Sequence, residues 1–246
     1  MIEMRVRSRS EEVVNALGRD IVNGVISPGE RLPKVEELSE NYGVSRTVMR
    51  EALQGLAARK IIRANQRSGT VVLPREEWQL WDLSVMSWLS ESEQRKDKFL
   101  LDLTEVRLGL EPDAAALAAK HATEDEKAKI TACFERLEQT LDDPKAWAAA
   151  DFDFHLSIIE ASHNQLMAGL LRLLHKGLIL SREKTVSSLN EHTELQQEKP
   201  TTEILNRHRN LYEAVMSGDA DRAKAVMTDM ILRVRQLIEA SQKQDN

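Results

Sequence analysis

Asp151, Asp153 and His155 lie close together in an apolar stretch of helical spacing, AAADFDFHLSIIEASHN, at residues 148–164. Asp151 and His155 are four residues apart, so a helix places their side chains on one face, one turn apart. Such a carboxylate and imidazole can act as an acid–base pair, as two ligands of a metal ion, or as an ordinary hydrogen-bonded pair. Asp153 is expected to point elsewhere, because one helix face does not hold both aspartates.

The composition of the 246-residue chain limits what surrounds this pair. Hydrophobic residues make up 41%, charged residues 30% and aromatic residues 4%, which favours a soluble, helical protein. The single cysteine, Cys133, excludes an intramolecular disulfide and fits a reducing compartment. No apolar run reaches the roughly 20 residues of a membrane helix. We therefore expect a cytoplasmic protein with no membrane partner.

The net charge of −6 is unevenly distributed along the chain. Residues 1–75 hold 13 Lys and Arg against 9 Asp and Glu, a balance of +4, and the remaining residues hold 21 against 31, a balance of −10. A basic first part joined to an acidic second part indicates that the first part contacts a polyanion.

The first 75 residues predict three short helices and a β-hairpin. We expect helices from Ser10 to about Gly24, from Lys34 to Tyr42, and after Ser45, with Gly43 as a left-handed cap between the last two. The following IIRANQRSGTVVL has two β-like runs around a polar turn. This order is the layout of a winged helix-turn-helix domain.

The third predicted helix begins with side chains suited to reading DNA. An arginine in its first turns can bind both guanine acceptors in the major groove, and the helix N-terminus itself favours phosphate. The hairpin would place an arginine and a glycine against the DNA backbone or minor groove. The alternative is a small helical domain whose charges are merely solvated. The candidate DNA-binding residues are Ser45, Arg46, Thr47, Arg50, Arg67 and Gly69.

We predict a DNA-binding domain at 1–75, a linker at 76–93 and a helical domain at 94–246. The linker carries three of the four tryptophans, which are expected to pack between the domains or across a dimer. The fold class is mainly α, with an N-terminal winged helix-turn-helix and a C-terminal all-α bundle. The tryptophans are Trp78, Trp81 and Trp88.

Every segment after residue 94 has helical spacing, and Pro112 predicts a kink in the first helix. Ser217, Gly218 and Asp219 predict a turn between two antiparallel helices. His208 and Met230 lie at similar distances on either side of this turn, so they could face each other. The expected helices are 95–121, 124–142, 144–162, 164–188, 201–216 and 219–241.

Two long stretches carry a family resemblance. SPGERLPKVEELSENYGVSRTVMREALQGLAARKII, with the later SGTVV, resembles the DNA-binding domain of the GntR family of bacterial repressors over roughly residues 10–73. EVRLGLEPDAAALAA, ADFDFHLSIIEASHN and RHRNLYEAVMSGDADRAKAVM resemble the helical effector domain (FCD domain) of its FadR branch. The resemblance implies that 94–246 is an effector-binding and dimerisation domain. One departure is Glu36, at a position where many members have a DNA-binding arginine, so that contact is absent or replaced.

The resemblance implies a divalent metal bound by an Asp-x3-His pair and two later histidines. Asp151, His155 and His208 match three of these ligands, and Met230 stands at the position of the last histidine. A thioether is a poor ligand for Zn²⁺ or Mn²⁺ in an oxygen and nitrogen site. We therefore expect three protein ligands and a weakly held Zn²⁺ or Mn²⁺ with open coordination positions.

The same resemblance implies a small carboxylate effector, such as a sugar acid. Its hydroxyl and carboxylate would fill the open metal positions, beside Asp151, His155 and His208, and Arg107 is the candidate anchor for the carboxylate. Alternatively, Arg107 pairs with Glu111, four residues on. The remaining histidines lack a comparable partner and are interpreted as structural or solvated. They are His121, His163, His175 and His192.

Two classes of function follow. The first is a homodimeric transcriptional regulator, most often a repressor in this family, that binds a pseudo-palindromic operator in double-stranded DNA and is released by its effector. The second is a metal-dependent hydrolase with an accessory DNA-binding domain. The hydrolase would need a nucleophile or general base beside the metal, and the sequence supplies no motif for one.

Overall fold

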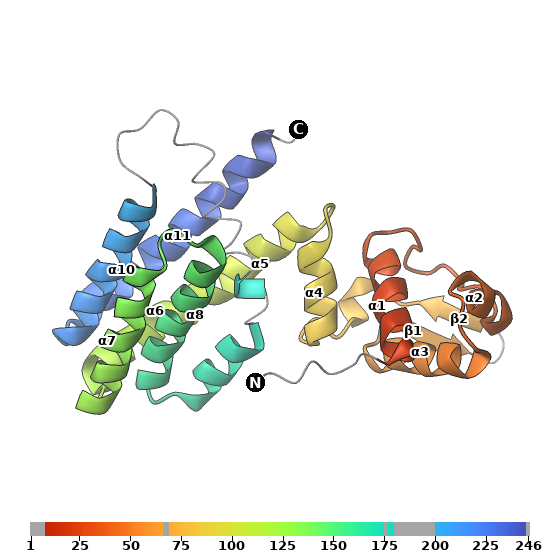
Figure 1. Cartoon of the computed structure of the whole chain (residues 1–246), viewed down its shortest axis with the longest axis horizontal. Helices are drawn as coiled ribbons and strands as arrows, with labels where there is room; N and C mark the ends of the chain where they lie inside the picture. The colour runs from red at the N-terminus through yellow and green to blue at the C-terminus, as the bar shows by residue number, and fades with distance from the viewer. Residues whose placement is uncertain (1–7, 66–68, 175–176, 180–199, 245–246) are drawn as a thin grey trace. The chain divides into compact units, whose positions relative to one another are not determined.

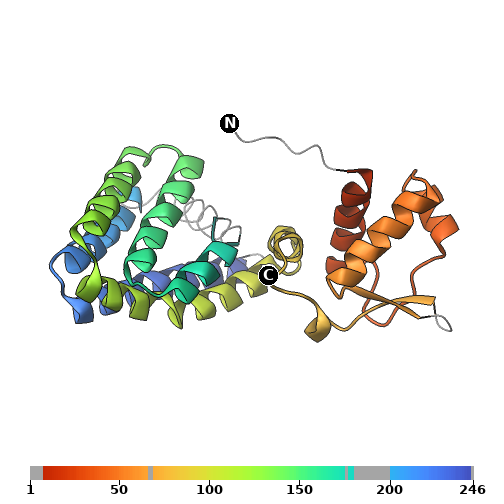
Figure 2. The same ribbon diagram turned by 90° about the horizontal axis from the view of Figure 1, so that it is seen from below.

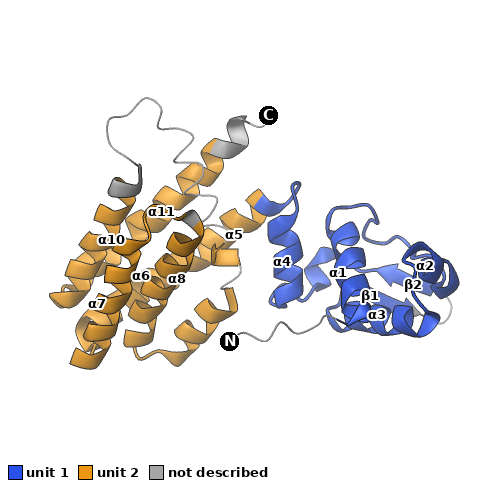
Figure 3. Cartoon of the chain, in the orientation of Figure 1, with its two compact units in different colours: residues 1–96 blue, residues 97–246 orange. Residues whose placement is uncertain are grey.

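A computed structural model describes residues 8–65, 69–174, 177–179 and 200–244 (Figure 1). The chain divides into two compact units, residues 1–96 and 97–246 (Figure 3). The predicted linker, 76–93, therefore belongs to the first unit. Among the described residues, no helix is both long enough and apolar enough to cross a membrane.

The first unit has the predicted winged helix-turn-helix architecture, with helices packed on a two-stranded antiparallel hairpin. Its core is built from apolar side chains of α1, α3 and the hairpin, including Leu17, Ile21 and Leu56. The hairpin pairs Ile62 with Val72 and closes at Asn65 opposite Gly69. Its elements are α1 (Arg9–Val22), α2 (Val35–Asn41), α3 (Arg46–Ala58), β1 (Ile62–Asn65), β2 (Gly69–Val72), the 3-10 turn η1 (Arg75–Glu77) and α4 (Leu83–Glu91).

Local capping explains where these helices begin and end. The hydroxyl of Ser45 accepts a hydrogen bond from the backbone N–H of Val48, so Ser45 is the predicted N-cap of α3. Gly43 has a φ of +62°, as expected for a left-handed cap. The start of α1 was predicted wrongly: its N-cap is Ser8, two residues before Ser10, because the Ser8 hydroxyl accepts from Glu11.

Two linker tryptophans belong to the core of the first unit, so the expectation that they pack between domains or across a dimer is wrong for them. Trp78 is 5% exposed and donates through Nε1 to the carbonyl of Leu73 at 2.9 Å. Trp88 is 1% exposed and donates to Asn15 of α1 at 3.0 Å. Trp81, in contrast, is 49% exposed.

The second unit is a bundle in which α6 lies against α8, α10 and α11, while α7 packs on α8 and α10. Figure 2 shows α7 and α8 side by side, in yellow-green and green, as in Figure 1. Residues 165–174 are also helical. The helices are α5 (Lys96–Leu108), α6 (Glu111–His121), α7 (Glu124–Gln139), α8 (Pro144–Ala161), α10 (Pro200–Met216) and α11 (Ala220–Gln244).

The segment predicted as one kinked helix, 95–121, is two helices. α5 ends at Leu108 and α6 begins at Glu111, with Pro112 in its first turn. Proline is well tolerated there, because its missing N–H would have no partner inside the helix. Pro112 therefore begins a helix rather than bending one, and the break brings the end of α5 next to the start of α6.

The predicted turn between α10 and α11 is confirmed. Gly218 has a φ of +75°, and the Asp219 carboxylate accepts from the backbone N–H of Arg222 at 3.0 Å. The two helices contact each other, and Met230, on α11, is 7% exposed in the bundle core. Residues 180–188 of the predicted helix 164–188 lie outside the described residues.

The contact between α1 and α4 depends on the absence of a side chain at Gly18. A Cβ atom there would lie 2.5 Å from the Trp88 ring. We expect Gly18→Ala to destabilise the first unit by about 1–3 kcal/mol through overpacking. Scanning calorimetry is the measurement. The matched control is Gly169→Ala, which meets nothing within 4 Å and should stabilise its helix by up to about 1 kcal/mol. Equal melting of Gly18→Ala and wild type would contradict this packing.

Candidate functional site

The N-terminus of α3 presents the predicted DNA-reading side chains to solvent. Ser45, Arg46, Thr47 and Arg50 are all exposed. Their exposure is compatible with insertion of this helix end into a major groove. In the wing, Gly69 is exposed with a φ of +76°, which favours glycine. Arg67 lies outside the described residues.

Glu36, at the departure from the family pattern, lies beside this surface. Its Oε1 atom is 3.7 Å from Nη1 of Arg46, and both side chains are about half exposed or more. An exposed ion pair of this kind contributes little to stability. It places a negative charge beside a candidate base-reading arginine.

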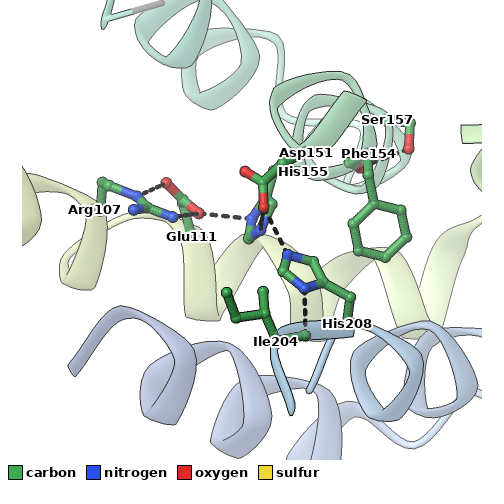
Figure 4. Close-up of polar contacts among 8 residues, drawn as sticks. All are labelled: Arg107, Glu111, Asp151, Phe154, His155, Ser157, Ile204 and His208. Carbon is green, nitrogen blue, oxygen red and sulfur yellow. Dashed lines mark hydrogen bonds and ion pairs between the residues drawn. The ribbon is translucent and has the colours of Figure 1, made fainter. Parts of the chain in front are cut away.

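The second unit brings Asp151, His155 and His208 together in its interior (Figure 4). Asp151 and His155 come from adjacent turns of α8, and His208 comes from α10. The Oδ1 atom of Asp151 lies 2.7 Å from Nε2 of His208 and 3.9 Å from Nε2 of His155. One oxygen thus lies between the Nε2 atoms of both rings, and all three residues are at most 7% exposed.

In both imidazole rings, Nδ1 lies at hydrogen-bond distance from an acceptor. In His208, Nδ1 lies 2.8 Å from the carbonyl of Ile204, which can only accept a hydrogen bond. In His155, Nδ1 lies 3.1 Å from Oε2 of Glu111. Protein metal sites commonly fix a histidine through a hydrogen bond at one nitrogen and bind the ion through the other. In His208 that other nitrogen, Nε2, lies at hydrogen-bond distance from Asp151, a contact that a shared ion would replace.

Glu111 connects this group to Arg107. Nε of Arg107 donates to Oε1 at 2.6 Å, and Nη2 donates to Oε2 at 3.2 Å. The two side chains are 4% and 0% exposed. Burial alone would raise the pKa of Glu111, but the Arg107 charge and the hydrogen bond with His155 outweigh it and hold that pKa well below its usual range. The two hydrogen bonds from Arg107 are those of a guanidinium–carboxylate ion pair, so Glu111 is treated as an ionised carboxylate inside the bundle.

Two aromatic side chains pack against His208 in the trio formed by Asp151, His155 and His208. The ring of Trp147, one turn before Asp151 on α8, lies edge-on to the His208 ring at 5.2 Å, and Phe154 lies 5.8 Å from the same ring. Trp147 is 1% exposed, and its indole N–H has no hydrogen-bond partner in the structure. Trp147 was not predicted from the sequence, although its spacing of four residues from Asp151 places it on the same face of α8.

Asp153 and the described histidines other than His155 and His208 do not belong to the trio. Asp153 points elsewhere, as predicted, and pairs with Arg136 at 2.7 Å on the surface. His163 does have a carboxylate partner, contrary to expectation: its Nε2 lies 2.9 Å from Glu126, near the start of α7. His121 stacks beside His163 at 6.5 Å. The remaining two histidines, His175 and His192, lie outside the described residues.

Comparison with known families agrees with both units. The profile of the bacterial regulatory proteins of the gntR family matches residues 9–72, and that of the FCD domain matches residues 102–233, more than half of the chain. The chain belongs to the GntR family. Its combination with an FCD domain is that of FadR-type regulators, as the sequence resemblance implied. Members of this family bind DNA operators, and FCD domains bind small effectors and can bind metals.

Individual relatives cover nearly the whole chain. The galactonate operon transcriptional repressor of Escherichia coli K12 is 27% identical, over 91% of this chain and 94% of the relative. The HTH-type transcriptional regulator LutR of Bacillus subtilis 168 is 30% identical, over 89% and 95%. A solved structure of Lar, from Listeria monocytogenes, has a TM-score of 0.62 at 19% identity over 96% of this chain and 99% of that chain, which shows the fold. The chain is thus a transcriptional regulator of this type.

The donor set fits a divalent ion. One carboxylate oxygen and two imidazole nitrogens all lie within 4.8 Å of one another. Donor atoms this close together, of the kinds that Zn²⁺ and Mn²⁺ accept, could contact one ion. Asp151, His155 and His208 would hold the ion, which supplies a positive charge and open positions for oxygen ligands when bound.

The stability of the second unit is expected to depend strongly on both members of the Arg107–Glu111 pair. Arg107→Met would leave Glu111 as a buried, unpaired charge, so we expect it to destabilise the second unit by about 3–5 kcal/mol. The double variant Arg107→Met/Glu111→Gln removes both charges, and it should be more stable than the single variant. Urea unfolding followed by circular dichroism measures both. A single variant as stable as the double variant would contradict the importance of the pairing.

Proposed function

We propose that this chain is an effector-controlled repressor that binds a pseudo-palindromic operator as a homodimer. The observation that carries the proposal is the presence, in one chain, of an exposed α3 N-terminus bearing Arg46 and Arg50 and a separate unit with a buried Asp151–His155–His208 group. One winged helix offers few base contacts, so two copies are needed for operator affinity, and two-fold symmetry then requires paired half-sites.

The proposed effector is a small hydroxy acid, and Asp151, His155, His208 and Arg107 are its proposed contacts. A weakly held Zn²⁺ or Mn²⁺ would accept its carboxylate and hydroxyl oxygens, and Arg107 would donate to the carboxylate. The unpartnered N–H of Trp147 supports a ligand rich in oxygen acceptors. The name of the galactonate operon repressor makes galactonate the first compound to test.

The hydrolase remains the less favoured function. Asp151 lies at hydrogen-bond distance from His208, and the Nδ1 atoms of both histidines already face acceptors. This arrangement supports holding an ion more than deprotonating a water molecule. The named relatives reported above are transcriptional regulators, which also favours sensing over turnover.

DNA recognition is expected to depend on the first turns of α3. Arg46→Ala and Arg50→Ala should each cost about 1–3 kcal/mol of operator binding and relax preference at one base pair if each arginine binds a guanine through two hydrogen bonds. Fluorescence anisotropy with an operator selected from a random library is the measurement. Arg172→Ala removes an exposed arginine from the second unit and is the control.

Operator binding that is unchanged in the double variant Arg46→Ala/Arg50→Ala would refute α3 as the recognition helix. Light scattering provides a separate check on assembly. Two chains are expected both in solution at micromolar concentration and on each operator duplex, and a monomer would count against the dimeric repressor.

Effector binding is expected to require the metal. The affinity for galactonate, or for another sugar acid identified by thermal shift, should fall with a chelator and return with Zn²⁺ or Mn²⁺, as isothermal calorimetry would measure. Met230→His should tighten metal binding by adding the fourth ligand. Asp151→Ala should keep operator binding but lose effector release. Asp153→Ala, on the same helix, is the control and should respond normally.

Two results separate the parts of this proposal. Equal effector affinity with and without chelator would remove the metal from the mechanism. A normal effector response in Asp151→Ala and His155→Ala would move the effector site away from this group.

A further inference from the structure

Glu111 is a carboxylate with no exposed surface that contacts functional groups from two helices. Its oxygens accept from Arg107, at the end of α5, at 2.6 and 3.2 Å, and Oε2 also lies 3.1 Å from Nδ1 of His155 on α8 (Figure 4). Burying a charged carboxylate is unfavourable unless it is paired and hydrogen-bonded. Apolar side chains could pack the same helices together without the free-energy cost of burying a charge. Packing alone therefore does not explain a carboxylate at this position.

The contact with His155 determines which of its nitrogens carries the hydrogen. An ionised carboxylate only accepts hydrogen bonds, so Nδ1 of His155 is the donor. In a neutral ring the lone pair then lies on Nε2, the atom 3.9 Å from Asp151. This is the tautomer that a metal ion requires at that position, because the ligand nitrogen has to be unprotonated.

The two candidate ligand rings, His208 and His155, are hydrogen-bonded at Nδ1 to different kinds of acceptor. Its Nδ1 donates to a backbone carbonyl, that of Ile204, whereas the Nδ1 of His155 faces a side chain. A main-chain acceptor is present whatever the residue type, whereas a side-chain acceptor depends on the residue at position 111. The orientation of His155 is therefore the part of the trio that a single substitution at a neighbouring position could alter.

We propose that Glu111 is a positioning residue for the metal site: it holds His155 in the tautomer and orientation that present Nε2 to a divalent ion. The inference rests on the proposed function, in which Asp151, His155 and His208 bind that ion. The same carboxylate also uses two of the five N–H donors of Arg107, so it ties the candidate effector anchor to a candidate metal ligand.

The experiment compares two double variants that share the same background. Arg107→Met/Glu111→Gln keeps an oxygen that can accept from Nδ1 of His155, whereas Arg107→Met/Glu111→Met has a side chain of similar length with no such acceptor. In both double variants, positions 107 and 111 are uncharged, so neither variant has a buried charge without its partner. Zn²⁺ alone is titrated into each protein in competition with a chromophoric chelator, with wild type and His155→Ala alongside and thermal melting as the check on folding.

We expect the glutamine variant to bind Zn²⁺ about 10–100-fold more tightly than the methionine variant, the usual effect of losing such a hydrogen-bond partner. The melting temperatures of the two should be similar. Equal Zn²⁺ affinity in two folded variants would overturn the role of Glu111 and leave the metal site intact. If wild type binds neither Zn²⁺ in this titration nor Mn²⁺ in a parallel one, the metal part of the proposed function is overturned, and this proposal with it.

A second measurement needs no substitution at position 111. Nitrogen-15 NMR of the imidazole rings in the wild-type protein reports which nitrogen of His155 is protonated, with His155→Ala identifying the signal. The Nδ1–H form is expected before Zn²⁺ is added, and coordination through Nε2 afterwards. A protonated Nε2 with a free Nδ1, or coordination through Nδ1, would overturn the proposal even if a double variant failed to fold.

Discussion

The burial of one carboxylate, Glu111, constrains the polar groups inside the second unit. A charge without solvent needs a counter-charge and hydrogen-bond donors at fixed positions. Arg107 supplies the first across the break between α5 and α6, and His155 supplies a donor from α8. The pairing thus adds polar contacts across the α5–α6 break and between α6 and α8, beside the apolar core that α6 and α8 share. Asp151 lies one turn before His155 on the same helix, α8. His208, on α10, lies at hydrogen-bond distance from Asp151. Changing the charge at position 111 would therefore affect both packing and chemistry.

The first unit depends on local signals, which is why its architecture could be predicted from the sequence. Ser45 caps α3 within one turn, Gly43 ends the preceding turn in a conformation that glycine favours, and the hairpin residues alternate over a short span. Each of these interactions joins residues close together in the chain. The tryptophans were assigned wrongly for the opposite reason. Trp88 bonds Asn15, 73 residues away, and composition alone does not distinguish a domain core from a domain interface.

The candidate site was predictable in part. The spacing of Asp151 and His155 put them on one helix face, and the family resemblance added His208, which the structure places 2.7 Å from Asp151. The pairing of Arg107 with Glu111 was weighed as an alternative because the two residues are four apart. The contact between Glu111 and His155 spans 44 residues and has no local signature. Pro112 also misled the prediction, because proline can bend a helix or begin one, and only the packing of both halves decides between them.

Charge balance connects the two proposed ligands of the site. Arg107 contributes one positive charge and Glu111 and Asp151 contribute two negative charges. Histidines have to be neutral to bind an ion, so the ion-binding form of the group is anionic. A divalent ion reverses the sign, and a monocarboxylate then restores neutrality. Because uncompensated charge is costly inside a bundle, each ligand removes part of the penalty for the other, and linkage requires the effect to be equal in both directions. Met230 offers no charge and little affinity for a hard ion. The effector would therefore be the group that strengthens binding of the ion. The ion would be weakly held until the carboxylate arrives, so a sensor of this kind would respond to the two together.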